Sequence, residues 1–174
     1  PYYFVLTAIG IAGSLSALQV LALGGIITTI LFILGTYLFS KSYFKNRWAP
    51  AITLMVFLFC WGAGWAWSNV YQFRILFYLT EYPSTFAMAF SLIAMWYTIH
   101  VHEHENLKYP NYILLVLSTA ILLLSHPLTA VFGISAMGLL VACDANSNIK
   151  KKIILISLIF LGALLAEFWP YFSF

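Results

Sequence analysis

Charged residues divide this chain into long apolar runs. No Asp, Glu, Lys or Arg occurs from Pro1 to Ser40, from Trp48 to Phe73, or from Tyr109 to Cys143. The runs lack the alternation of period two that marks strands, and they are rich in Leu, Ile and Ala, so they indicate helices. Proline, which the first turn of a helix tolerates, stands near the start of several runs. The pattern predicts helices at 17–39, 49–68, 83–100, 110–125, 127–143 and 153–172.

Composition shows what surrounds these helices. Hydrophobic residues make up 63% of the 174 residues and charged residues only 7%, against about 25% charged in a soluble domain. This composition excludes a soluble enzyme and a disordered tail. The net charge of +3 is also too small for a protein that binds nucleic acid. A spanning helix needs about 20 apolar residues. We therefore expect an all-α fold, a single domain over 1–174 that forms a polytopic transmembrane helical bundle of about six membrane helices.

The segment before the first long helix is too short to span a bilayer. We expect 1–16 to form an interfacial helix at the outer surface and 17–174 to hold the membrane helices. The alternative is that 1–16 is the second half of a span, since we also expect the chain to be part of a longer protein.

Basic residues predict the orientation in the membrane. Cytoplasmic loops carry an excess of Lys and Arg, and alternating the predicted spans places seven of the eight cations on one side and Arg74 on the other. We expect a multi-pass protein of the plasma membrane with these seven cations inside: Lys41, Lys45, Arg47, Lys108, Lys150, Lys151 and Lys152.

Two short helices meet at Ser125-His126-Pro127. The arms of this His-Pro helical hairpin at 110–143 are about 24–26 Å long, whereas the hydrocarbon core is about 30 Å thick. The turn should therefore be recessed, and a broken backbone at that depth must be buried in protein or line a wet cavity. The sequence predicts an outward-facing polar cavity near His126.

Four polar residues fall on the outer side of this topology: Arg74, Glu81, His126 and Glu167. Ionisable groups within a membrane are costly and indicate function by default. Arg presents a planar fork of donors that suits phosphate, so this group is a candidate site for a lipid phosphate. The alternatives are structural: Arg74 pairs with Glu81, Glu167 ties two helices together, and His126 caps a helix.

A second polar cluster contains His100, His102 and His104. On a continued helix His100 and His104 share a face at the spacing of metal ligands, which makes them weak metal candidates. A solvated helix end is the alternative.

Several short motifs resemble multi-pass glycosyltransferases of the GT-C superfamily. Tyr82-Pro83-Ser84-Thr85-Phe86-Ala87, Ser125-His126-Pro127-Leu128-Thr129-Ala130 and the closing Trp169-Pro170-Tyr171 are similar to helix starts in that group, and residues 1–18 resemble its outer surface helix and following span. The resemblance implies transfer of a sugar from a polyprenyl-phosphate donor on the non-cytoplasmic face. It also implies that Arg74 and His126 contact the donor phosphate while Glu81 and Glu167 orient them.

The resemblance assigns no catalytic residue to this chain. The family's catalytic acid lies in a first external loop, which would precede Pro1, and any divalent metal would be held there too. Two other functions fit the same residues. One is a transporter segment that uses Glu167 and the broken hairpin as a substrate path, and the other is a non-catalytic membrane subunit of a larger assembly that contacts lipid.

Overall fold

A computed structural model describes residues 2–60, 80–104, 109–145 and 147–169. Every regular element within these ranges is a helix, which confirms the all-α prediction. The helices are α1 (Tyr2–Gly13), α2 (Ala17–Phe44), α3 (Ala49–Phe59), α5 (Pro83–Glu103), α6 (Tyr109–Ser125), α7 (Pro127–Ala142) and α8 (Ile149–Glu167).

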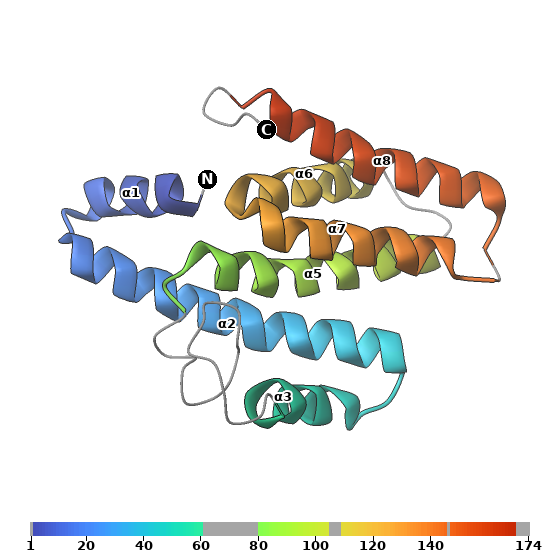
Figure 1. Cartoon of the computed structure of the whole chain (residues 1–174), viewed down its shortest axis with the longest axis horizontal. Coiled ribbons are helices and arrows are strands. Elements are labelled where there is room, and N and C mark those ends of the chain that lie inside the picture. Colours follow the sequence, from blue (N-terminus) through green and yellow to red (C-terminus); the bar gives the residue numbers. More distant parts are fainter. Residues whose placement is uncertain (1, 61–79, 105–108, 146, 170–174) are drawn as a thin grey trace.

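Helix α5 is the central element of the bundle (Figure 1). It packs against α2, α6 and α7, while α8 covers α6 and α3 lies against α2. The roughly parallel and antiparallel helices give the bundle two ends. We call one the basic end, which carries Lys45, Glu103, Asp144 and Lys151. We call the other the His126 end, which carries Tyr2, Glu81, His126 and Glu167.

Two helices, α2 with 28 residues and α5 with 21, are long and apolar enough to cross a membrane. Helices α1, α3, α6 and α7 are apolar but shorter. Large apolar side chains are exposed over much of the bundle, among them Leu18, Ile52 and Phe160. Exposed apolar surface on this scale indicates contact with lipid or with another protein.

The observed helix bounds differ from the predicted ones near the charged residues. Helix α2 continues to Phe44 and ends at Lys45, which adopts a left-handed conformation with φ of 51°. Helix α5 continues to Glu103, so His102 lies on the helix and not in a loop, whereas we expected the helix to end at residue 100. Of the predicted helix at 49–68, α3 covers Ala49–Phe59, and 61–68 lies outside the described residues.

The last helix is displaced toward the N-terminus. Helix α8 begins at Ile149 and ends at Glu167, whereas we expected 153–172. The Asn148 side chain accepts a hydrogen bond from the backbone N–H of Lys150 and so caps the helix before the lysine run. Asn is a favoured N-cap residue because its side-chain oxygen satisfies an otherwise unpaired N–H. The prediction considered only the apolar residues, so it left the three lysines outside the helix.

Helix α1 runs back alongside the first turns of α2. A Cβ atom on Gly24 would lie 2.9 Å from the Tyr2 hydroxyl, and one on Gly10 would lie 2.8 Å from a Val20 methyl. The turn between the helices ends in a capping box, in which Ser16 and Gln19 bond each other's backbone N–H groups. An antiparallel hairpin of this kind is compatible with both expectations for residues 1–16.

Small residues set the close approach of the helices in the core. A Cβ on Gly35 of α2 would lie 2.8 Å from the Ala89 carbonyl oxygen of α5, and one on Gly162 of α8 would lie 2.7 Å from the Thr119 Cβ of α6. Glycine permits backbones to come this near because it has no side chain to displace. The interfaces of α2 with α5 and of α8 with α6 therefore depend on glycine.

Several buried hydroxyl groups in these helices bond to the backbone of their own helix. The side chains of Thr36, Ser91 and Thr98 donate to carbonyl oxygens four residues earlier, at 2.7, 2.7 and 2.8 Å. A buried polar group is costly unless it is hydrogen-bonded. These bonds allow polar side chains inside an apolar bundle without a partner from another helix.

Candidate functional site

His126 caps the first turn of α7. Its Nδ1 accepts a hydrogen bond from the backbone N–H of Thr129 at 3.3 Å and lies 2.9 Å from the Thr129 hydroxyl. The structural role that we gave as an alternative is therefore present. A neutral imidazole that accepts at Nδ1 carries its proton on Nε2. The half-buried ring thus keeps one N–H donor that the cap does not use.

Tyr2 ties α1 to the start of α5. Its buried hydroxyl donates to the Glu81 carbonyl oxygen at 3.2 Å, while the Glu81 residue as a whole is exposed. Burial is the main cause that raises the pKa of Tyr2 above its ordinary value. Glu81 therefore holds this junction through its backbone carbonyl, and its negative charge adds to the rise in the pKa of Tyr2.

A cavity of about 290 Å³ lies beside this junction. A second cavity of about 250 Å³ adjoins it through the shared side chains of Phe90 and Ile121. Together they form an apolar trough between α5 and α6 that extends from Ser125 to Tyr97.

The cavity that the described residues form beside Ser125 is not the polar cavity that we expected near His126. Ser125, next to His126 in sequence, lines the trough, but the lining is almost wholly apolar. The reason is that the nearby hydroxyls bond to the backbone: Ser125 donates to the Ile121 carbonyl at 2.6 Å, and Tyr2 donates to the Glu81 carbonyl.

Glu167 is the last residue of α8 and is exposed, so it lies at the end of its helix, whereas we expected the helix to continue past it. The rings of Phe4 and Trp169 are 6.2 Å apart, which places this end of α8 near α1. Arg74 lies outside the described residues. The structure therefore brings Glu81, His126 and Glu167 to one end of the bundle, and the ion pairs among the described residues lie at the other.

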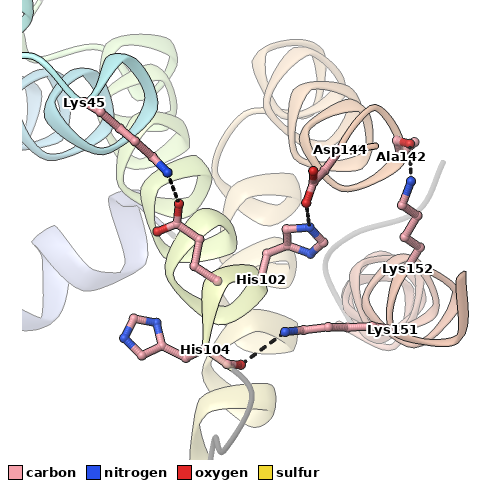
Figure 2. A network of polar contacts seen from close by, with 8 residues as sticks. Lys45, His102, His104, Ala142, Asp144, Lys151 and Lys152 are labelled. Atoms are coloured by element: carbon pink, nitrogen blue, oxygen red, sulfur yellow. Dashed lines mark hydrogen bonds and ion pairs between the residues drawn. The ribbon is translucent and has the colours of Figure 1, made fainter. Parts of the chain in front are cut away.

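That other end holds a site that the sequence analysis missed. His102 Nε2 lies 2.7 Å from Asp144 Oδ2, and the His102 side chain is only 10% exposed. Lys45 and Glu103 pair at 3.1 Å (Figure 2). Lys151 Nζ donates to the His104 carbonyl at 3.2 Å, and Lys152 Nζ donates to the Ala142 carbonyl at 2.9 Å.

A sequence signal for His102 does exist. Met95, Thr98 and His102 follow one another at helical spacing on the face of α5 that the structure buries or half-buries. Had the predicted helix been extended past residue 100, His102 would have fallen on the inner face.

His100 and His104, the weak metal candidates, pack against each other with ring centroids 4.3 Å apart and ring planes tilted by 42°. The His104 Nδ1–H donates to the His100 carbonyl at 2.9 Å. No group of three His, Cys, Asp or Glu residues suited to a metal ion is found within the ranges that the structure describes.

A cavity of about 260 Å³ opens at the basic end, and its lining includes Lys45, Thr98, His102, Glu103 and Asp144. A larger and mostly apolar cavity of about 510 Å³ adjoins it, lined by Phe39, Met95, Ala136 and Leu139 among others. Tyr43, Leu140 and Asp144 belong to both.

No protein-family model matches the sequence, and no curated protein or solved structure matches it either.

Proposed function

We propose that the chain is a multi-pass membrane bundle, oriented with the basic end in the cytoplasm, that forms the lipid-donor side of a glycosyltransferase of the GT-C type. The donor is a polyprenyl-phosphate sugar bound at the His126 end, on the non-cytoplasmic face. The proposal assigns no catalytic acid among residues 1–174.

The apolar trough carries this proposal. It follows α5 from Phe86 to Tyr97, eleven residues, or roughly 16 Å at the rise of an α-helix. An open and nearly apolar trough suits an isoprenoid chain, which makes van der Waals contacts and needs no hydrogen-bond partner.

The head of the lipid would lie where the trough ends, near His126. The free Nε2–H of the capped His126 ring is a hydrogen-bond donor that a phosphate oxygen accepts. Arg74 supplies the positive charge that the described residues at this end lack. Glu81 and Glu167 lie at the same end of the bundle, and in this proposal they orient the cation and the sugar hydroxyls.

The test is turnover of a polyprenyl-phosphate sugar by the full-length protein in lipid nanodiscs. His126→Asn keeps a favoured N-cap residue but removes the Nε2–H. We expect kcat/KM to fall about tenfold or more, the effect of losing one hydrogen bond to a charged group. His100→Asn, at the opposite end, is the matched control. Undiminished transfer by both His126→Asn and Arg74→Ala would remove the two residues from the donor site.

The trough itself is tested at Ile121, which lines both of its cavities. Ile121→Trp fills the shared region and should raise the KM for long-chain donors. Ile113→Trp adds the same ring to an exposed position of α6 and should leave the KM unchanged. Equal kinetics of the two variants would contradict the proposed path of the lipid chain.

A further inference from the structure

The apolar trough is barred at the end that lies away from His126. Its walls, α5 and α6, run in opposite directions. Phe86 of α5 and Ser125 of α6 line the trough at one end. At the other end the Tyr97 hydroxyl of α5 donates to Asn111 of α6, at 3.0 Å to Oδ1 and at 3.2 Å to the carbonyl oxygen. The Tyr97 side chain therefore crosses from one wall to the other, and we call its contact with Asn111 the polar bar.

The polar bar differs from the other polar groups of the trough. Ser118 and Ser125 also line it, but their hydroxyls donate to carbonyl oxygens of their own helix, at 2.8 and 2.6 Å. They leave the space between the walls open, whereas Tyr97 crosses it. An apolar chain that continued between the walls past Tyr97 would have to break the hydrogen bonds of the bar and leave polar groups facing hydrocarbon, which is costly.

Ring contacts hold the Tyr97 side chain in this position. Its ring centroid lies 6.2 Å from that of His100, with 29° between the ring planes, and 6.2 Å from that of Trp96. The tip is held by hydrogen bonds and the ring by its neighbours, so a movement of the side chain out of the trough loses both kinds of contact. The bar is therefore a fixed end of the trough.

The distance to the bar limits the length of chain that the trough can hold. From Phe86 to Tyr97 the trough follows eleven residues of α5, or roughly 16 Å at the rise of an α-helix. An isoprene unit adds four main-chain bonds, which span about 4.5 Å if they reach as far as the bonds of an extended polypeptide. The trough thus has room for about three to four isoprene units.

We propose that the polar bar sets how much of an isoprenoid chain this protein recognises. The units nearest the phosphate lie between α5 and α6, and the rest of the chain turns at Tyr97 into the surrounding bilayer through the open side of the trough. This recognition rests on the proposed function, which supplies the occupant, and it adds the range of donors. Carriers longer than about four units bind equally well, and shorter ones bind less tightly.

The test is the retention of prenyl monophosphates by the full-length protein. The protein is loaded in nanodiscs of a single phosphatidylcholine with an equimolar series that grows by one isoprene unit at a time, from well below to well above the length of the trough. It is then extracted in mild detergent and examined by native mass spectrometry, which separates the lengths by mass. We expect retention to rise about tenfold up to about the fourth unit, because each unit adds van der Waals contacts with the walls, and to stay constant beyond it.

Removal of the bar should move this limit to longer chains. Tyr97→Leu keeps an apolar side chain on α5 that is too short to reach Asn111. Retention should then rise for about one further unit, because Asn111 lies one helical turn, roughly 5 Å, beyond Leu114, which lines the end of the trough. Tyr109→Leu makes the same exchange at a position of α6 that is 86% exposed, and it should leave the limit unchanged.

A new obstacle should move the limit to shorter chains. Leu117 lines the middle of the trough and is 45% exposed, so Leu117→Trp fills the space between the walls without crowding the core. Retention should then stop rising at about the second unit. Ile113→Trp, at an exposed position of α6 outside the lining, is the matched control and should keep the limit of the wild type. Circular dichroism compares the helical content of the variants, and if Tyr97→Leu fails to fold, the pair at positions 117 and 113 decides.

Retention that does not depend on chain length, retention that keeps rising past the trough length in the wild type, or phosphatidylcholine held in place of every prenyl phosphate would each overturn the inference. A folded Tyr97→Leu variant with the wild-type limit, or equal limits for Leu117→Trp and Ile113→Trp, would overturn it too. The measurement requires binding but not transfer. A length limit without sugar transfer would contradict the glycosyltransferase alone, and transfer without a length limit would contradict the role of the bar alone.

Discussion

Adding one methyl group at Gly162 should loosen the contact of α8 with α6. An alanine Cβ at this position would lie 2.7 Å from the Thr119 Cβ, and the Val116 carbonyl oxygen is nearer still. Carbon atoms make their best contact at about 3.5 Å, so α8 must retreat by about 0.8 Å. A gap of that size forfeits a quarter to a half of the contact energy of the atoms it separates.

The side chains that lose contact are the buried residues of α8: Leu155, Ile159 and Ala166. Overpacking of this kind costs about 1–3 kcal/mol. Alanine also stabilises a helix by about 1 kcal/mol relative to glycine, which offsets part of the loss. A second glycine isolates the clash. A Cβ on Gly138 of α7 would meet nothing within 4 Å, so Gly138→Ala has the helix gain without the collision.

The difference between Gly162→Ala and Gly138→Ala should therefore be about 1–3 kcal/mol, or about 2–12 °C in Tm for a chain of this length. Thermal unfolding of both variants in the same detergent measures it. Gly162→Ala should melt below the wild type or near it, and Gly138→Ala at or above it. If both variants melt at the same temperature, the packing of α8 on α6 is not as tight as the structure has it.

Three further variants test the polar contacts. His102→Ala should destabilise the protein by about 1–3 kcal/mol, measured by the same melts, because the hydrogen bond between His102 and Asp144 is lost; an unchanged Tm would show that this bond contributes nothing. Ser16→Ala should cost about 1 kcal/mol through loss of the capping box, and Ser16→Asp should recover most of it. The pKa of Tyr2 is raised, so its contribution to stability is present below pH of about 10 and is lost as the pH rises further. Tyr2→Phe should flatten that alkaline loss of Tm, and an identical pH profile would refute the buried hydroxyl.

The sequence predicts the helices well where the signal is hydrophobic and poorly where it is local and polar. The predicted helices at 110–125 and 127–143 agree with α6 and α7 to within one residue at each end, because His126 and Pro127 break the run. The end of α2 at Lys45 and the start of α8 at Asn148 depend on a left-handed residue and on one side-chain cap. Neither feature changes the hydropathy of its apolar run. A prediction from the positions of apolar and charged residues therefore misplaced both helix ends.

The sequence predicts which residues share an end of the bundle but not which side chains pair there. Counting spans predicts that Glu81, His126 and Glu167 share one end of the bundle, and the helix bounds agree with that prediction. The pairing of His102 with Asp144 does not follow, because it joins residues 42 positions apart in sequence through the rotation of α5 relative to α7. That rotation depends on which small residues meet across the interface.

The buried hydroxyls described above have a consequence for motion. A hydroxyl bonded to a carbonyl of its own helix, as in Thr36, Ser91 and Thr98, travels with that helix and loses no bond when the helix slides. Contacts between elements such as Tyr2 with Glu81 and His102 with Asp144 lie instead at the two ends. Small shear movements of the packed helices are therefore opposed in the middle of the bundle mainly by packing. At the two ends of the bundle, hydrogen bonds between elements also oppose these shear movements. A ligand that breaks one of these end contacts would therefore allow a whole helix to slide more easily.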